Sequence, residues 1–351
     1  MLGSKPEQLN LKSLEPLEPL EQPEQLKHLS QPFVSVIIPV YNDAKRLKLC
    51  LDALEHQTYP GDRYEVVVVD NGSDANENIA GVADSYRQVI VTQELTPGSY
   101  AARNTGIAVA RGEVIAFTDA DCIPASNWIE MGVHHLLQTS NCGMVVGNIE
   151  IFPQDSDCPT PVELFEMATA FPQEHHLKTL RYGATANLFT LKSVLEQVGG
   201  FHQDLKSGGD LDWGRRVYAS GYQQIYSQDV QVAHPARATF QQMQQKVTRL
   251  AGGHYDLLKR NLYHFFYQDS LPFAIANLKL FPPVIRTNLI FLLILVQDLI
   301  PPVMYVITAS RSPKLKSWNE KFKVALVIVF VRYSSAWAKI RLRIGASPAR
   351  T

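Results

Sequence analysis

Runs of consecutive Val and Ile residues alternate with amphipathic segments over the first third of the chain, and this alternation limits the possible folds more than any other feature. The apolar runs predict strands at 33–40, 64–70, 88–93 and 113–121. Segments with a helical pattern lie between them, at 43–57, 75–87 and 99–112. Continuous apolar strands separated by helices are typical of a parallel sheet with helices on both faces. The sequence therefore predicts an α/β fold with a doubly wound, mainly parallel, Rossmann-like sheet.

Composition divides the chain into three parts. Residues 1–32 repeat Leu, Glu, Pro and Gln without a regular period, so we expect a disordered N-terminal tail. This tail does not resemble a secretory signal, because no apolar core follows a basic start. Residues 33–236 contain the strands and helices of the predicted α/β domain. Residues 237–351 become helical and then strongly apolar, which predicts a helical C-terminal region that associates with a membrane.

Two apolar stretches in the C-terminal region have features that disfavour a simple membrane span. Residues 287–309 approach the required length, but Asp298 lies near the middle, where a carboxylate costs about 3 kcal/mol. Residues 322–345 are interrupted by Arg332 and end in a basic run. Because the connection between the stretches is also basic, we expect it to stay cytosolic, with kinked or in-plane helices on the cytoplasmic leaflet, attracted to anionic lipid. A buried helical subdomain is the alternative.

Charge and cysteine content narrow the choice of partners and compartment. The chain has 33 Lys and Arg residues against 34 Asp and Glu residues, so it lacks the positive field that nucleic-acid binding requires. Its four cysteines form no C-x-x-C pair and no zinc-site spacing. We therefore expect no nucleic-acid partner and reduced thiols in a cytosolic compartment.

Polar residues follow the predicted strands at their carboxyl ends. Pro39 and Tyr41 close the first strand, Asp70 closes the second, and Asp119 and Asp121 close the fourth. Because side chains alternate along a strand, the last two carboxylates project the same way and suit Mg²⁺ or Mn²⁺. A pair of solvated loop aspartates is the alternative. No G-x-G-x-x-G or P-loop is present, whereas an aromatic ring and a carboxylate are available to hold a nucleobase.

Four motifs together resemble the family 2 glycosyltransferases, which have the GT-A fold. In chain order they read "VSVIIPVYN", "VVVVDNGS", "ARNTGIAVARGEVIAFTDAD" and "GGDLDWGRRV", and the similarity covers about residues 33–237. The resemblance implies inverting transfer of a hexosyl unit from a nucleoside diphosphate sugar, with a UDP-sugar favoured. The implied acceptor is a hydroxyl of a polysaccharide, glycolipid or lipid-linked glycan, and the implied cofactor is Mn²⁺ or Mg²⁺.

The resemblance also implies roles for single residues in donor binding. It places Pro39, Tyr41 and Asp70 at the nucleotide base. Arg103 is placed at the base or the diphosphate. Asp119 matches a family residue that lies near the ribose or donor sugar and also near the metal. Asp121 matches the residue that binds the metal. A metal at the diphosphate would stabilise the charge that gathers as the glycosidic bond breaks.

An inverting displacement needs a base opposite the leaving group, and Asp210 matches the family's catalytic base. Gly209 stands where family members usually carry Glu. Asp212 is a rival candidate for the base, although it can instead form an exposed helical pair with Arg216, four residues later. Trp213 shares a helical face with Asp210, so it could wall the acceptor site, but core packing is the alternative.

Three further residues are candidates for donor or metal contacts. Asn187 lies in "YGATANLF", which resembles the family segment that lines the donor sugar, and an ordinary polar loop residue is the alternative. His234 and Arg237 lie in "AHPAR", where the resemblance suggests metal or diphosphate contacts. A structural histidine is the alternative for His234.

Two other functions compete with glycosyl transfer. A nucleotidyltransferase acting on sugar phosphates also uses metal-bound carboxylates, but it usually has a glycine-rich basic loop after its first strand, and "PVYNDAKR" has no glycine. A catalytically inactive, membrane-bound interaction protein of the same fold is the third hypothesis. Gly209 is its only support.

Overall fold

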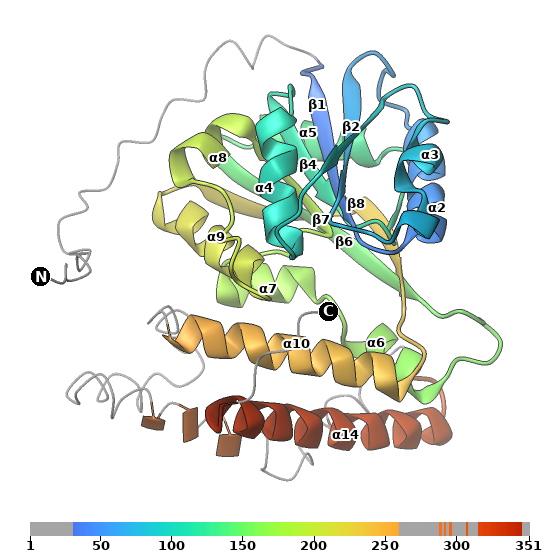
Figure 1. Ribbon diagram of the computed structural model, residues 1–351, viewed down its shortest axis with the longest axis vertical. Helices are drawn as coiled ribbons and strands as arrows, with labels where there is room; N and C mark the ends of the chain where they lie inside the picture. Colours follow the sequence, from blue (N-terminus) through green and yellow to red (C-terminus); the bar gives the residue numbers. More distant parts are fainter. Residues whose placement is uncertain are drawn as a thin grey trace, which may run out of the picture.

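The computed structural model describes residues 31–259, 288–289, 291–292, 295–296, 307 and 315–345 of the chain (Figure 1). Its strands are β1 (Val34–Val40), β2 (Tyr64–Asp70), β3 (Val89–Gln93), β4 (Val114–Thr118), β5 (Ile123–Pro124), β6 (Cys142–Phe152), β7 (Asn187–Leu191) and β8 (Gln223–Pro235). Its α-helices are α2 (Ala44–Glu55), α3 (Ile79–Ala83), α4 (Ser99–Val109), α5 (Trp128–Gln138), α6 (Pro161–Thr169), α7 (Gln173–Leu180), α8 (Lys192–Val198), α9 (Gly209–Ala219), α10 (Phe240–Lys259) and α14 (Trp318–Arg343).

The strands form one mixed sheet in the order β3-β2-β1-β4-β7-β6-β8-β5. Pairing is parallel from β3 through β4 and again between β6 and β8. It is antiparallel on both sides of β7 and between β5 and β8. The α/β class predicted from the sequence is therefore found. The sheet is also mainly parallel, as predicted, because six of its eight strands run in one direction; β7, which separates the two parallel parts, and the short β5 are the reversed strands.

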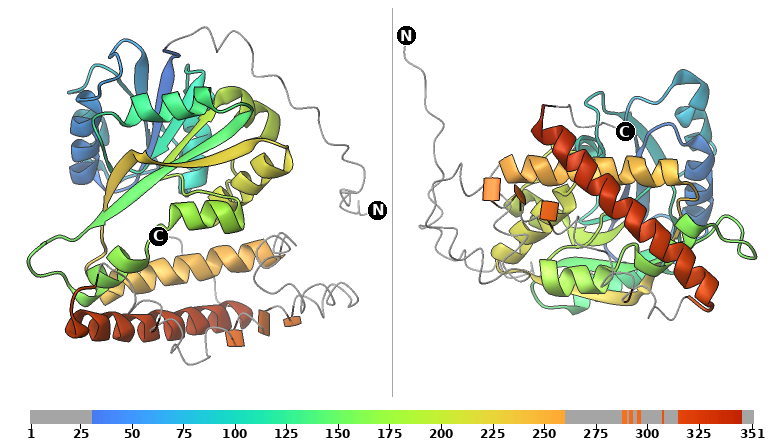
Figure 2. Two further views of the ribbon diagram at one scale, coloured as in Figure 1. Left: turned by 180° about the vertical axis from the view of Figure 1, so that it is seen from behind. Right: turned by 90° about the horizontal axis from the view of Figure 1, so that it is seen from below.

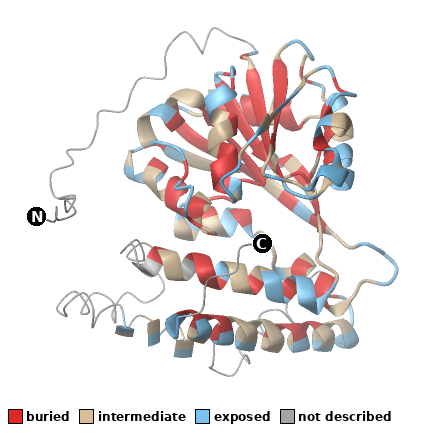
Figure 3. Cartoon of the chain, in the orientation of Figure 1, coloured by how far each residue is buried: buried red, intermediate tan, exposed pale blue. Residues whose placement is uncertain are grey.

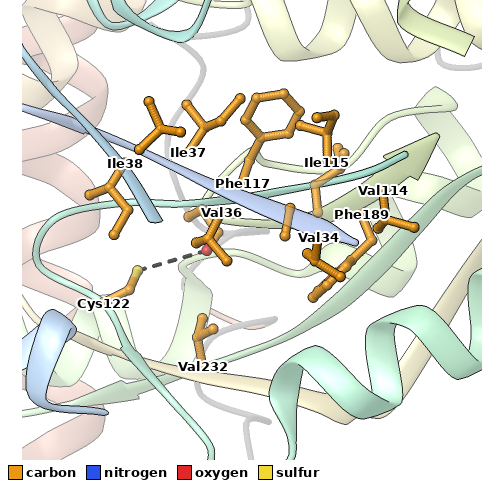
Figure 4. Packing of buried hydrophobic residues seen from close by; sticks show 14 of the residues in the cluster. Val34, Val36, Ile37, Ile38, Val114, Ile115, Phe117, Cys122, Phe189 and Val232 are labelled. Carbon is orange, nitrogen blue, oxygen red and sulfur yellow. Dashed lines mark hydrogen bonds between the residues drawn. The ribbon is translucent and has the colours of Figure 1, made fainter. Parts of the chain in front are cut away.

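The core lies on both faces of the central strands, as their unbroken apolar runs predict. All residues from Val34 to Ile38 of β1 are buried, including Ser35, and Figure 3 shows the central strands as largely buried. Phe117 from β4 and Phe189 from β7 fill the space beside β1 (Figure 4). The ring of Trp128 on α5 packs against Phe189 with centroids 4.7 Å apart. Burying such aromatic side chains contributes most of the packing free energy in a core of this kind.

A second layer, formed by α6, α10 and α14, lies on one side of the sheet (Figure 2). Small apolar clusters join its helices, including Leu164 with Val324 and Met243 with Val327. β6 leads into α6 and β8 leads into α10, so the carboxyl ends of the parallel strands face this layer.

Helix α10 also packs against the segment that precedes α9. A Cβ atom placed on Gly208 would lie 2.8 Å from Cδ1 of Leu257, and one placed on Gly253 would lie 2.5 Å from Ser207. Gly253 therefore permits a close approach to the Ser207 backbone that any larger residue would prevent, whereas at Gly208 the end of the Leu257 side chain would have to shift.

The expected domain boundary near residue 236 falls between β8 and α10. Most of residues 1–32 and of 287–309 lie outside the described residues. Residues 322–345 fall on α14 and the turn after it. None of the helices in the described part of the chain combines the length and the apolar character needed to cross a bilayer.

Candidate active site

The carboxyl ends of β1 and β2 bring together the three residues predicted at a nucleotide base. Pro39 pairs with Val69 in the sheet, and Val40 pairs with Asp70, so Tyr41 follows directly beside Asp70. The Tyr41 side chain is 57% exposed and is available to stack on a ligand. Asp70 Oδ1 accepts a hydrogen bond of 2.9 Å from the Ser73 backbone amide, which fixes the carboxylate at the strand end.

Arg103 joins α4 to the acidic segment after β4. Its guanidinium donates to Asp119 Oδ1 at 2.6 Å and has only 5% of its side chain exposed. Its Nε atom is buried without a hydrogen-bond partner in the described structure. A charge held this firmly by Asp119 is suited to orient a carboxylate or bind a phosphate.

Asp121 lies opposite His234 at the end of β8. His234 Nε2 is 3.6 Å from Asp121 Oδ2, and Arg46 Nη1 lies 3.7 Å from the same oxygen. Burial raises the pKa of Asp121; the charge on His234 opposes this rise and the nearby Asp119 adds to it. This pair of carboxylate and imidazole is placed where the sequence resemblance puts a metal contact.

Ligand atoms of Asp121, Cys122 and His234 lie within 4.8 Å of one another. Oxygen and imidazole donors fit Mn²⁺ or Mg²⁺. The Cys122 thiol is directed to the Ala186 carbonyl oxygen, 3.8 Å away, and burial raises its pKa well above the ordinary value. Because only a thiolate is a strong metal ligand, Asp121 and His234 fit the ion better than Cys122 does.

Asp210 is the second residue of α9, which begins at Gly209. The residue before the helix, Gly208, has a left-handed φ of 82°. Its Oδ1 atom accepts a hydrogen bond from the Tyr100 hydroxyl at 3.2 Å and another from the Leu211 amide at 3.0 Å. Burial raises the pKa of Asp210, while the charge of Arg103 and these hydrogen bonds lower it. A carboxylate with a raised pKa in the first turn of a helix, within reach of the Arg103 charge, suits a general base.

The rival residue Asp212 is engaged elsewhere. It is buried and forms an ion pair with Arg216, 3.0 Å away, and the pair runs along α9 as the spacing predicts. The sequence-based view that this pair is exposed was wrong, because the carboxylate has only 6% of its side chain exposed.

Two residues predicted to contact substrates are instead part of the interior. Asn187 is fully buried; it accepts from Trp128 Nε1 and donates to the carbonyl oxygens of Asn148 and Val230. Trp213 is also fully buried, and its Nε1 donates to the Gly199 carbonyl oxygen. Both side chains have their polar groups satisfied within the protein, so the structure gives them a packing role in place of the predicted sugar and acceptor contacts.

Arg237 is held by an acidic residue that the sequence analysis did not identify. Its Nη1 lies 3.1 Å from Oε2 of Glu166, a carboxylate that is almost completely buried and also lies 2.5 Å from Lys246 Nζ. Neighbouring Phe171 has a left-handed φ of 48° and packs its ring against His234, with centroids 5.1 Å apart. Arg237 thus belongs to a cluster that connects the His234 region to α6 and α10.

Sequence reasoning also missed Tyr100 and Tyr182 beside the candidate base. Tyr100 precedes Arg103 by three residues on α4, so an analysis of helix faces would have grouped the two. Tyr182 is recognisable only from the structure, where the charge of Asp210 helps to raise the pKa of its phenol after the larger effect of burial.

An α/β sheet with an aromatic residue and acidic groups at the carboxyl ends of its strands, beside an arginine on α4, has the features of a ligand-binding site. Residues 35–200 match the family described as glycosyl transferase family 2. The chain is 40% identical over 227 residues to glycosyltransferase AglE of Haloferax volcanii, covering 63% of this chain and 73% of that protein. It belongs to the family 2 glycosyltransferases.

Two other similarities extend this comparison. Glycosyltransferase GlyG of Streptococcus pneumoniae is 34% identical over 120 residues, which span 33% of this chain and 38% of that protein. A solved structure of mannosyltransferase PcManGT from Pyrobaculum calidifontis, in complex with GDP-Man and Mn²⁺, aligns with a TM-score of 0.56 and 20% identity over 89% of each chain. That likeness shows a shared fold, consistent with the GT-A class expected from the sequence.

Proposed function

We propose that this protein transfers a glycosyl unit from a nucleoside diphosphate sugar to an acceptor hydroxyl with inversion at the anomeric carbon. The observation that supports this proposal is the position of Arg103. It bonds to Asp119 in the donor half of the site, and its charge also acts on Asp210, the candidate base. Donor-binding and proton-accepting groups therefore lie within the field of one guanidinium.

In the proposed reaction, Tyr41 and Asp70 hold the nucleobase, and Asp119 with Arg103 orients the donor. The oxygen of the acceptor hydroxyl attacks the anomeric carbon while Asp210 accepts the hydroxyl proton, and the bond from the anomeric carbon to the diphosphate breaks. Asp121 and His234 would hold Mn²⁺ or Mg²⁺. When bound, this ion supplies positive charge that stabilises the departing diphosphate.

The donor and acceptor belong to the proposal as classes. The structural relative in complex with GDP-Man supports a nucleotide sugar as donor. A UDP-sugar remains the donor expected from the sequence. We propose a glycan or lipid-linked glycan as the acceptor. The carboxyl edge of the sheet faces the helical layer, and α14 of that layer is the helix that we propose to bind the membrane.

The experiment is a panel of UDP- and GDP-sugars incubated with the purified full chain and Mn²⁺, with release of nucleoside diphosphate as the readout. Asp210→Asn should bind donor in a thermal-shift assay but lose transfer by at least about a hundredfold. Asp212→Asn is the matched control and should retain far more activity. Full turnover by Asp210→Asn would contradict the proposed base, and release of pyrophosphate from a nucleoside triphosphate would support nucleotidyl transfer instead.

We further propose a membrane surface on the cytoplasmic side as a partner of this protein. Support comes from the outer face of α14, where large apolar side chains are exposed away from α6 and α10. They are Trp318, Phe322, Leu326, Tyr333 and Trp337. At 100° per residue they fall within a sector of about 100°, with Lys323 and Arg341 along one border.

An exposed apolar strip with basic residues at its border is typical of a helix that lies in the plane of an anionic membrane. Trp318 is 84% exposed and Trp337 is 60% exposed, so both rings are available to enter the headgroup region. This arrangement would place the carboxyl edge of the sheet on the same side of the molecule as a lipid-linked acceptor.

A further inference from the structure

We propose that Tyr100 is a positioning residue for Asp210: its hydroxyl, admitted by the absence of a side chain at Gly209, bonds to one carboxylate oxygen and leaves the other to accept the acceptor proton. This proposal rests on the assignment of Asp210 as the base.

The first observation is steric. A Cβ atom on Gly209 would lie 2.8 Å from both Cε2 and Cζ of the Tyr100 ring. That distance is shorter than van der Waals contact, and the ring is not free to swing away. It stacks on Phe201 with centroids 5.7 Å apart, and the guanidinium of Arg103 lies 5.7 Å from the ring centroid. Tyr100 can occupy this place only when residue 209 is glycine.

The second observation is the direction of the hydrogen bonds. The Tyr100 hydroxyl and the Leu211 amide both donate to Oδ1 of Asp210. Two donors on Oδ1 fix the plane of the carboxylate and stabilise its charged form. Oδ2 is then the oxygen that faces an incoming hydroxyl and receives its proton.

The third observation concerns the protonation of the phenol itself. Burial raises the pKa of Tyr100, and the negative charge of Asp210 raises it further. The hydroxyl therefore keeps the proton that it donates to Asp210. Among the described residues, the other ionisable groups that interact with Asp210 are Arg103 on α4 and Tyr182 in the segment before β7. Arg103 favours the charged carboxylate as Tyr100 does, whereas the neutral Tyr182 adds no charge.

Tyr100→Phe is the informative variant, because it keeps the ring that packs on Phe201 and removes only the hydroxyl. Without this donor the charged form of Asp210 is less stable, so the pKa of Asp210 rises. The acid limb of the profile of kcat/KM against pH should move upward by about one pH unit, with activity below that limb reduced about tenfold. Activity on the alkaline plateau should be nearly unchanged. A purely structural loss would instead lower activity at every pH.

Tyr64→Phe is the matched control, since Tyr64 is another buried tyrosine whose hydroxyl donates to the Leu54 carbonyl oxygen, 2.7 Å away, outside the candidate site. It should leave the acid limb in place. Gly209→Ala should shift the limb in the same direction as Tyr100→Phe, because it displaces the ring. The double variant should shift the limb no further than the larger of the two single shifts. An unmoved acid limb in Tyr100→Phe, or additive shifts in the double variant, would overturn the proposal.

A second readout separates this proposal from the assignment of the enzyme's activity. The carboxyl carbon of Asp210 can be followed by NMR in protein labelled at aspartate, with Asp210→Asn identifying the signal. Its titration should move upward in Tyr100→Phe in the absence of any donor. If no nucleotide sugar is turned over but this shift appears, the proposed function fails and the positioning contact stands. If the titration is identical in both proteins, the positioning contact is refuted whatever the activity.

Discussion

His234 Nε2 lies 3.6 Å from Asp121 Oδ2, although His234 belongs to β8 and Asp121 follows β4. The short antiparallel pairing of Ile123 with Ala233 brings the two segments together. Among the described residues, this pair therefore links the acidic segment after β4 to the chain that leads into the helical layer.

We expect His234→Ala to weaken the response to Mn²⁺. Removing one of two proposed ligands should raise the Mn²⁺ concentration needed for half-maximal donor turnover by at least about tenfold. Electron paramagnetic resonance of bound Mn²⁺ measures the same change without turnover. His135→Ala is the control, because His135 pairs with Asp229, 2.8 Å away on α5 and β8, and is not part of the candidate metal site. Equal Mn²⁺ responses in the two variants would contradict the assignment of His234.

Glu166→Gln should destabilise the fold strongly. The carboxylate is almost fully buried between Arg237 and Lys246, so its removal leaves two cations without their common partner. Breaking a buried ion pair in this way costs about 3–5 kcal/mol. Urea denaturation of the full chain measures the loss. Glu174→Gln removes an exposed pair with Lys178 and should cost about 0.5 kcal/mol or less. Similar losses in the two variants would show that burial does not govern the contribution of Glu166.

Glu65 should make stability depend on pH in the acid range. Burial tends to raise the pKa of this carboxyl, but hydrogen bonds from Ser35 and Arg111 and the Arg111 charge outweigh it, so the pKa lies below its usual value. A group with a depressed folded-state pKa stabilises the protein above the unfolded-state value of about 4.3 and loses this contribution as the pH falls through the folded-state pKa. Urea midpoints measured from pH 7 to pH 3 should fall less steeply for Glu65→Gln than for the unchanged protein. Parallel slopes would refute this prediction.

Gly132→Ala should disturb the contact between α5 and β7. A Cβ atom at this position would lie 2.4 Å from the Phe189 ring, which is itself fully buried. Overpacking of this kind typically costs about 1–3 kcal/mol, which thermal denaturation detects. Gly61→Ala is the comparison, because its new Cβ atom would meet only the flexible end of the Gln88 side chain. A loss at Gly61 as large as that at Gly132 would argue against rigid packing on Phe189.

Replacing Trp318, Phe322 and Trp337 together by Ser should reduce binding to vesicles that contain anionic lipid. Each exposed apolar side chain contributes up to about 2 kcal/mol when it enters the membrane interface, so partitioning should fall by more than tenfold. Vesicle flotation at low and high salt measures the effect. Leu49→Ser with Tyr218→Ser removes exposed apolar groups from the α/β domain and should leave flotation unchanged. If this control loses binding equally, α14 is not the membrane-binding face.

The strands of the N-terminal half were predictable because their apolar runs are continuous. β1 and β2 lie where the sequence indicates, and their ends bring Tyr41 beside Asp70. β4 ends at Thr118, three residues before the predicted end, so Asp119 and Asp121 lie in the turn after the strand and have different partners, Arg103 and His234. β7 was not predicted as a strand, because its five residues lie outside the long Val and Ile runs from which the strands were predicted. Its reversed direction depends on pairing with β4 and β6, which are distant in the chain.

The candidate site was only partly predictable for a similar reason. Asp119, Asp121 and Asp210 each lie next to a local signal, a strand end or a helix start. Asn187 and Trp213 carry the same kind of polar or aromatic signal, yet tertiary contacts bury both. A single sequence does not distinguish a polar side chain that faces a ligand from one that bonds to Trp128 in the interior.

The position of β7 also has a consequence for how the chain folds. β4 is followed in the sheet by β7, not by the next strand along the chain, so its edge stays open during synthesis until residues 187–191 leave the ribosome. Pairing over such a long separation slows folding, and an open apolar edge invites association between nascent chains. We expect refolding from denaturant to be slow and to lose yield as protein concentration rises.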